Sequence, residues 1–227
     1  MTMELLAPAG GEEPFRAALA AGADAIYCGV GNDFNARRGA SNFTYDAFEQ
    51  ACRAAHLAGT RVYVTINVVV RDEEMDRALA LVRSAALRGA DAFIQDWGLF
   101  EALRHTWPEL ELHVSTQANV HDARGVRWAR ERGAHRVTLS RELSLPEISR
   151  IAKEGVELEV FGHGALCFCY SGVCLMSSMV GGRSANRGLC AQPCRLLYQL
   201  VDEQGRDISA PGRTRPLCPK DACTASD

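Results

Sequence analysis

The chain of 227 residues is long enough to bury a substantial core, and its 47% hydrophobic and 23% charged residues are ordinary for a globular protein. Its formal net charge of −3 excludes a protein that binds nucleic acid through a strongly basic overall charge. No apolar run approaches the roughly 18 residues of a membrane-spanning helix, and the N-terminal MTMELLAPAG lacks the basic region of a secretory signal. We therefore expect a cytoplasmic protein, in which nine cysteines indicate metal, cluster or catalytic thiols rather than a disulfide framework.

A helix-like segment that ends in glycine and continues into a β-rich run recurs along the chain. The closing glycines are Gly22, Gly59, Gly89, Gly133 and Gly155, each where a left-handed residue is expected. The pattern predicts seven strands, at about residues 3–8, 24–30, 61–68, 91–96, 111–118, 136–141 and 157–163. Strands alternating with helices indicate parallel βα units. Seven units in succession favour an α/β fold of the TIM-type (β/α) barrel over a doubly wound sheet.

Two of the intervening helices carry recognisable start signals. Thr44 is the expected N-cap of the helix in TYDAFEQACRAAHLAG, and Ser144 with Glu147 forms the expected capping box of the helix in SLPEISRIAKEG.

The pattern changes after residue 195. LLYQLVDEQGRDISA predicts a small hairpin that turns at Gln204 and Gly205, and no eighth βα unit follows. We therefore expect an apparently incomplete barrel. Residues 1–195 form its domain, including a Cys-rich loop at 163–195, and residues 196–227 form a hairpin with a C-terminal segment.

Polar residues follow the predicted strands, at the end where TIM-type barrels carry their chemistry. This position predicts a pocket for a polar small molecule or a base, with a structural hydrogen-bonding role as the alternative for each residue. The catalytic candidates are His163, Glu142 and Gln117. The candidates for binding substrate are Asn67, Asp96, Ser115 and Arg141, joined by Arg37, whose guanidinium at the pocket rim would hold a carboxylate.

Five cysteines lie within 28 residues, between His163 and Arg195. Cys167 and Cys174 are separated by six residues, and Cys190 and Cys194 by three. Zinc would favour C-x2-C knuckles, whereas this looser spacing is compatible with a [4Fe–4S] cluster. A disulfide, or a nucleophilic cysteine with His163 as its base, remains open. Buried thiols acting as small hydrophobes are the expectation for Cys52 and Cys28.

The same segment resembles a known family signature. EVFGHGALCFCYSGVCLMS, from Glu159 to Ser177, is similar to the signature of the peptidase U32 family, and GGRSANRGLCAQPCRLLY, ELLAPAG, GADAIYCG, FNAR, HVSTQANVH and SRELSLPEI extend the resemblance over the chain. The resemblance implies either a collagenase-like protease or an oxygen-independent hydroxylase with a [4Fe–4S] cluster. Such hydroxylases act on a tRNA uridine, an rRNA cytidine or a ubiquinone precursor, with prephenate implicated as the oxygen source in the RNA cases.

The resemblance places the cluster ligands at Cys167, Cys174, Cys190 and Cys194, with Cys223 as rival for the fourth place and Cys169 as a packed neighbour. Residues 160–201 hold no acid, and their arginines, including Arg183, would meet an RNA backbone or lie in a solvated loop. The favoured hypothesis is an enzyme that hydroxylates a pyrimidine base in rRNA or tRNA, with prephenate as a possible co-substrate. The alternatives are a peptidase acting on protein, and a truncated or non-catalytic Fe–S partner subunit.

Overall fold

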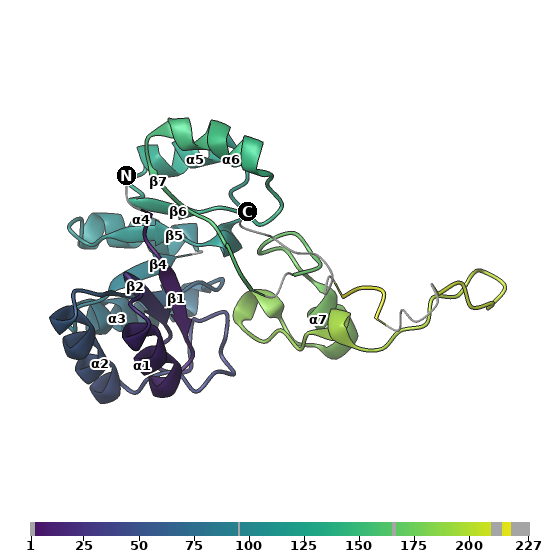
Figure 1. The fold of residues 1–227 in the computed structure, drawn as a ribbon, viewed down its shortest axis with the longest axis horizontal. Coiled ribbons are helices and arrows are strands. Elements are labelled where there is room, and N and C mark those ends of the chain that lie inside the picture. Colours follow the sequence, from purple (N-terminus) through teal and green to yellow (C-terminus); the bar gives the residue numbers. More distant parts are fainter. Residues whose placement is uncertain (1–2, 95, 165–166, 210–214, 219–227) are drawn as a thin grey trace.

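A computed structural model describes residues 3–94, 96–164, 167–209 and 215–218 of the chain. Its centre is one sheet of seven parallel strands that lie side by side in chain order (Figure 1). The strands are β1 (Leu6–Ala9), β2 (Ala25–Cys28), β3 (Arg61–Ile66), β4 (Asp91–Ile94), β5 (Leu112–Val114), β6 (Arg136–Thr138) and β7 (Glu157–Glu159). All seven predicted strands are confirmed. Most end before the predicted residue, because the polar residues that follow them already belong to loops.

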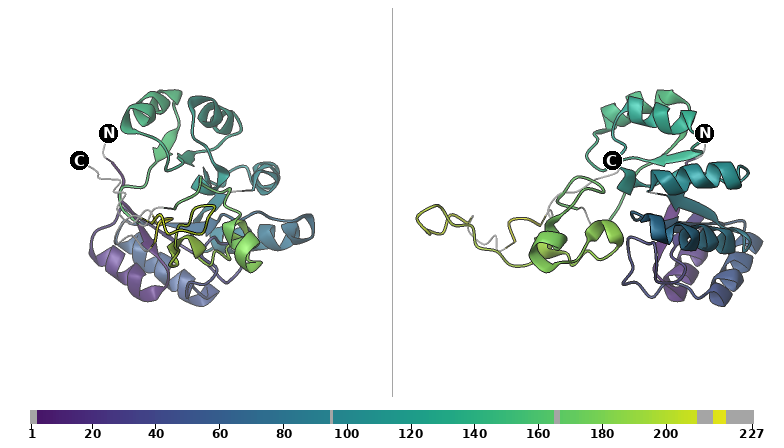
Figure 2. Two further views of the ribbon diagram at one scale, coloured as in Figure 1. Left: turned by 90° about the vertical axis from the view of Figure 1, so that its right-hand side faces the viewer. Right: turned by 180° about the vertical axis from the view of Figure 1, so that it is seen from behind.

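Helices connect the successive strands and cover the outer face of the sheet (Figures 1 and 2). They are α1 (Glu12–Ala20), α2 (Tyr45–Leu57), α3 (Met75–Ala86), α4 (Trp97–Thr106), α5 (Ala123–Glu131) and α6 (Leu145–Ile151), while α7 (Met176–Gly181) belongs to the Cys-rich segment. The predicted caps are confirmed, since Thr44 Oγ1 accepts a hydrogen bond from Ala47 N at 3.3 Å and Glu147 Oε2 accepts one from Ser144 N at 2.8 Å. The five closing glycines all have positive φ, between 75° and 92°.

Alternation along the strands gives the sheet two different faces. The outer face is apolar, and Val62, Val64, Leu112 and Val137 pack there against the helices in the main core. The inner face carries polar side chains and aromatic rings with polar groups, including Tyr63, His113, Arg136 and Thr138. The core therefore lies between sheet and helices, and the inner face is free to form a polar interior.

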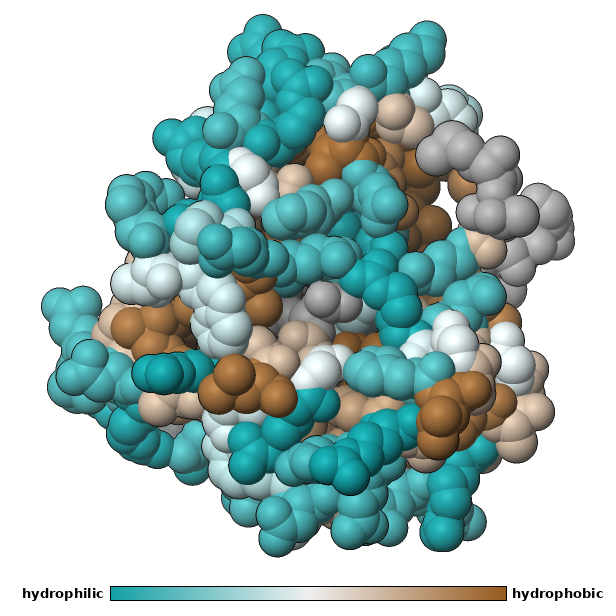
Figure 3. Space-filling view, turned by 90° about the vertical axis from the view of Figure 1, so that its left-hand side faces the viewer, coloured by the Kyte–Doolittle hydropathy of each residue, from teal (hydrophilic) through white to brown (hydrophobic). Residues whose placement is uncertain are grey.

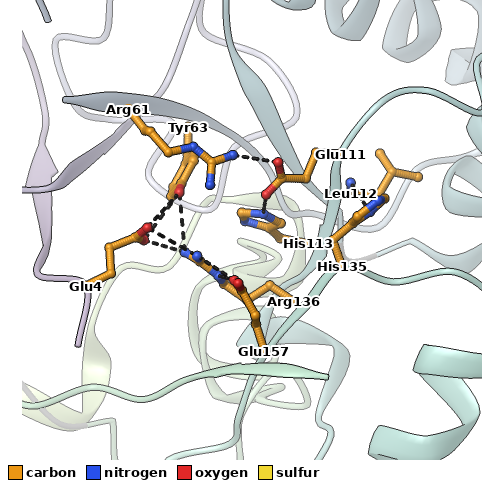
Figure 4. A network of polar contacts seen from close by, with 9 residues as sticks. All are labelled: Glu4, Arg61, Tyr63, Glu111, Leu112, His113, His135, Arg136 and Glu157. Atoms are coloured by element: carbon orange, nitrogen blue, oxygen red, sulfur yellow. Dashed lines mark hydrogen bonds and ion pairs between the residues drawn. The ribbon is translucent and has the colours of Figure 1, made fainter. Parts of the chain in front are cut away.

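A network of charges joins distant strands across this interior (Figure 4). Arg136 of β6 pairs with Glu4, which precedes β1, at 2.6 Å and with Glu157 of β7 at 2.8 Å. The Tyr63 hydroxyl of β3 contacts Glu4 at 3.2 Å. Because residues near β1, β3, β6 and β7 meet on one side of the sheet, the sheet is strongly curved. Within the described residues β1 pairs only with β2 and β7 only with β6, so the strands do not close into a ring.

A second pair of contacts extends the network to β5. Glu111 accepts hydrogen bonds from Arg61 at 2.5 Å and from the His113 ring at 2.8 Å. These contacts, led by the one from His113, lower the pKa of Glu111 to about 2. A carboxyl group with cationic or hydrogen-bonding partners thus stays ionised in this interior.

The predicted hairpin is present and extends away from the sheet (Figure 2). Val201 and Asp207 form an antiparallel bridge, and Gly205 adopts a φ of 78° in the turn between them. The opposite end of the molecule presents a mainly hydrophilic surface (Figure 3). In the described parts of the chain, no helix is both long and apolar enough to cross a membrane.

Candidate functional site

A cavity of about 270 Å³ with many polar side chains in its lining, here called the inner pocket, lies on the inner face of the sheet. The strands contribute Tyr27, Cys28, Thr65, Thr138 and Glu159 to its lining, and the segments that follow strands contribute Asn35, Arg37, Asn42, Asn67, Gln117 and Arg141. The pocket therefore opens at the carboxyl ends of the strands, where the sequence predicted a binding site.

Arg37 lies on a loop at the rim of the inner pocket, and asparagine side chains hold this loop in place. Asn35 Oδ1 accepts a hydrogen bond from the Arg37 backbone N–H at 2.7 Å, and Asn35 Nδ2 donates to Asn42 Oδ1 at 3.1 Å. Asn67 Oδ1, after β3, accepts from Ala36 N at 2.8 Å. Arg37 itself is exposed. Its guanidinium is therefore available to an anionic group entering the pocket.

A short turn after β5 supplies the wall between two cavities. Ser115 Oγ accepts a hydrogen bond from Gln117 N at 3.1 Å, which starts the 3-10 turn Thr116–Ala118. Ser115 lines the inner pocket, while Gln117 lines both this pocket and a neighbouring one. Ala36 and Arg141 also line both. The two cavities are thus adjacent.

The neighbouring cavity, of about 240 Å³, is here called the thiol cavity. Its lining holds Cys167, Cys169, Cys174, Cys190 and Cys194, all of them free thiols. Apolar side chains such as Phe168, Leu175 and Pro193 complete it. The chain brings together the four predicted ligands, and it adds Cys169, which had been expected only to pack beside them.

The thiols are close enough to influence one another. Burial raises the pKa of Cys194, and the neighbouring Cys167 and Cys190 raise it further. Burial and the neighbouring Cys174 likewise raise the pKa of Cys169. Cys190 Sγ accepts weak hydrogen bonds from Gln192 N at 3.4 Å and from Ser177 Oγ at 3.8 Å. Crowded thiols with backbone and hydroxyl donors are a soft ligand set that a cationic centre would stabilise.

No group of three or more His, Cys, Asp or Glu side chains in the described ranges is placed to hold a single metal ion. A [4Fe–4S] cluster differs from one ion because it occupies the space between its thiolate ligands. Five thiols line this cavity, and such an arrangement suits a cluster better than it suits a single metal ion.

Two polar anchors hold the Cys-rich segment over the strand ends. Glu142 accepts a hydrogen bond from Ser171 N at 2.9 Å, and Arg141 Nε donates to Ser171 Oγ at 3.2 Å. On the other side, both terminal nitrogens of Arg187 donate to the Glu74 carboxylate at 2.6 Å. These hydrogen bonds hold the pKa of Glu74 far below its usual range. Arg187 is therefore a structural anchor rather than a free contact for RNA.

Close packing at Gly172 seats the same segment against the wall turn. Gly172 has a φ of 74°, and a Cβ there would lie 1.9 Å from the Gln117 backbone oxygen. We expect Gly172→Ala to force this segment off Gln117 and to accelerate hydrogen exchange in residues 167–195. Gly182→Ala is the matched control, because Gly182 has a φ of 64° and open space around it, so it incurs only the left-handed penalty of about 1–2 kcal/mol. Equal exchange in the two variants would contradict this account.

The structure brings some predicted site residues together and places others elsewhere. Arg37, Asn67, Ser115, Gln117 and Arg141 all line the inner pocket. Four other predicted residues line neither cavity, and these are Asp96, Glu142, His163 and Arg183. Asp96 is the N-cap of α4 and accepts from Leu99 N at 2.9 Å. His163 and Arg183 are exposed. The catalytic or substrate-binding roles expected of these four residues stay predictions, because none of the four lines either cavity.

Sequence reasoning missed Glu159 and Thr138, which line the inner pocket from β7 and β6. A signal for Glu159 was present, because ELEVF places two acids on one face of a strand expected to be buried.

A parallel α/β sheet with a pocket at its strand ends defines the class of protein, and solved structures support it. A structure titled as the U32 peptidase Mk0906 aligns with a TM-score of 0.59 over 70% of this chain and 68% of that one, at 19% identity. A putative glycerophosphoryl diester phosphodiesterase from Agrobacterium tumefaciens aligns with a TM-score of 0.50 over 70% and 85% of the two chains, at 9% identity. At these identities the likeness shows the fold alone.

The sequence then identifies the family. The sequence model of peptidase family U32 matches residues 10–227, and the chain belongs to this family. The Escherichia coli 23S rRNA 5-hydroxycytidine C2501 synthase is 41% identical over 91% of this chain and 31% of its own length. The Bacillus subtilis tRNA hydroxylation protein P1 is 37% identical (91% and 49%), and a Porphyromonas gingivalis collagenase is 32% identical (88% and 51%). The chain thus spans about a third to a half of these relatives.

Proposed function

We propose that the protein is a U32-family enzyme that hydroxylates a pyrimidine base in rRNA or tRNA without molecular oxygen. Relatives at 41% and 37% identity bear the names of an rRNA hydroxycytidine synthase and a tRNA hydroxylation protein. The observation that carries the proposal is the shared wall of the two cavities. Gln117 and Arg141 line both the thiol cavity and the inner pocket, so a group held by the thiols would adjoin a molecule in the pocket.

The cofactor of this proposal is a [4Fe–4S] cluster in the thiol cavity. Its ligands would be Cys167, Cys174, Cys190 and Cys194, all of which line that cavity. Cys169 lines the same cavity as a packed neighbour of these ligands. Cys223, the rival for the fourth place, lies outside the described residues. When bound, such a cluster supplies one-electron redox chemistry.

The inner pocket would hold the small co-substrate, for which prephenate is the candidate. Arg37 and Arg141 stand at its rim with guanidinium groups suited to carboxylates. Asn67, Ser115 and Gln117 add amide and hydroxyl groups suited to orienting a polar ligand. In this scheme the chain itself binds and orients the co-substrate next to the thiols.

RNA would approach the Cys-rich segment from outside, where Arg183 is exposed and no acid lies between residues 160 and 201. We place the protein in the cytoplasm, in keeping with the free state of every described cysteine. We also infer that the curved sheet is the greater part of a TIM-type barrel domain, residues 1–195, followed by the hairpin and C-terminal segment of 196–227.

The second candidate is a collagenase-like peptidase, since one relative is named a collagenase. That activity requires a nucleophile next to a base, or a metal with an open position. His163 lines neither cavity, so it is not placed with the thiols that line the thiol cavity. The arrangement therefore supports hydroxylation better than peptide hydrolysis.

The test is the nucleoside content of RNA from a strain that lacks the gene. We expect mass spectrometry of digested rRNA and tRNA to show loss of one hydroxylated pyrimidine, and the intact gene to restore it. The matched variant is Arg141→Met, which removes a guanidinium shared by both cavities and is expected to restore less than about a tenth of the product. An unchanged set of modified nucleosides in the deletion strain would overturn the proposal.

A further inference from the structure

Glu159 occupies a distinctive place on the inner face of the sheet. It is the last residue of β7, and its register partner on β6 is Thr138. The preceding register pair on this face is Arg136 with Glu157, whose side chains form an ion pair in the network of Figure 4. Glu159 and Thr138 thus form the next layer above that network, and both line the inner pocket.

Two buried polar atoms in this layer lack hydrogen-bond partners. Among the described residues neither Glu159 Oε2 nor Thr138 Oγ1 has a hydrogen-bond partner at standard distance and angle, although both atoms are buried. A buried polar group without a partner costs about 1–3 kcal/mol, so such groups in native proteins usually serve a function or bind a ligand. Two of them side by side on the wall of one cavity indicate where a polar group of the pocket's occupant binds.

The surroundings of Glu159 differ from those of the other interior carboxyl groups. Arg136, the cation of the layer below, is already paired with Glu4 and Glu157. Burial raises the pKa of Glu159 to about 7, while the charge of Arg136 and the neighbouring Thr138 hydroxyl oppose the rise and the charge of Glu4 adds to it. Tyr27 of β2 lines the same pocket, and its pKa is raised by burial and by the charge of Glu159, with Arg37 opposing the rise. Near neutral pH both protonation states of Glu159 are therefore populated.

We propose that Glu159 is the proton-exchanging catalytic residue of the inner pocket, where it contacts a hydroxyl or amino group of the bound small molecule together with Thr138. The proposal rests on the function given above, in which this pocket holds the co-substrate. As a carboxylate, Glu159 accepts the proton of the ligand's O–H or N–H group, and that oxygen or nitrogen keeps the electron pair. The carboxylic acid so formed later returns the proton, so no electron enters or leaves.

Two parts of the inner pocket suit two different chemical groups of the ligand. Arg37 and Arg141 at the rim suit an anionic group, whereas Glu159 and Thr138 suit a group that both donates and accepts hydrogen bonds. The occupant is therefore a small molecule with an anionic end and a hydroxyl or amino end. A ligand with anionic groups at both ends would meet repulsion from ionised Glu159.

The first measurement is the titration of Glu159 itself, by NMR of the full chain labelled with ¹³C at glutamate side-chain carboxyl carbons. We expect one resonance with a midpoint near pH 7 in the unaltered protein, absent from Glu159→Gln and retained in the surface control Glu109→Gln. A Glu159 midpoint below about pH 5 would overturn the proposal. This result does not depend on which reaction the enzyme performs.

The second measurement is the pH dependence of base hydroxylation by the anaerobically reconstituted full chain. Glu159→Gln is expected to lower kcat by about 100-fold or more and to remove the limb of the profile near pH 7, with KM for RNA nearly unchanged. Full activity with an unchanged profile in this variant would overturn the assignment even if Glu159 titrates as expected. If the unaltered protein hydroxylates no RNA, the proposed function fails, and the NMR titration still decides the state of Glu159.

Discussion

Replacing Cys174 with serine is expected to remove nearly all iron and acid-labile sulfide from anaerobically purified protein. Cys174 lines the thiol cavity, and it contributes to the raised pKa of both Cys169 and Cys194. Serine matches cysteine in shape but does not supply the thiolate that a cluster requires. Iron and sulfide analysis, together with the absorbance of the cluster, measures the effect.

Two further variants separate ligands from neighbours. Cys218→Ser is the matched control, because Cys218 does not line the thiol cavity and its loss should leave the iron content unchanged. Cys169→Ser tests the fifth thiol, which we expect to be a packed neighbour whose replacement retains the cluster. Full iron content in Cys174→Ser would refute the ligand assignment, and loss of iron in Cys169→Ser would transfer a ligand place to Cys169.

The elements of the fold could be predicted because local signals agreed with the tertiary structure. The glycines that close helices, such as Gly59 and Gly133, adopt the left-handed conformation that their position requires. Thr44 and Ser144 cap the helices that follow them. β5 and β6 are buried on both faces, but the side chains on the inner face are polar rather than apolar. There Arg136 and Glu159 replace an apolar interior with a network and a pocket.

The candidate site was only partly predictable, because a position at a strand end does not determine where a side chain points. Ser115 and Asn67 turn toward the inner pocket, whereas Asp96 turns back to cap α4. Glu142 accepts a hydrogen bond from the backbone N–H of Ser171. This contact depends on the path of a loop nearly thirty residues away along the chain. The cysteine spacing predicted thiols that lie together, and these thiols line one cavity, but the spacing did not indicate that this cavity would adjoin the inner pocket.

Arg136→Met is expected to destabilise the fold by about 3–5 kcal/mol. The substitution removes the cation that pairs with Glu4, next to β1, and with Glu157 of β7, so it breaks the contact between the two edges of the sheet. The Arg136 side chain is only 8% exposed and pairs with Glu4 at 2.6 Å, so its loss leaves that carboxylate against Tyr63 without a cation. Glu157→Gln is the control, with an expected loss below about 1 kcal/mol, because the Glu157 side chain is 63% exposed. Urea unfolding followed by circular dichroism measures both values.

The same variant tests how the network and the inner pocket are coupled. Arg136 opposes the rise in the pKa of Glu159, so its removal should shift the Glu159 titration to higher pH. In the proposed reaction, a Glu159 that is protonated at neutral pH would bind a ligand hydroxyl but could not accept its proton, so the proposed hydroxylation is expected to require more alkaline conditions. A Glu159 midpoint that stays unchanged in Arg136→Met would show that the two layers act independently, which the register between β6 and β7 argues against.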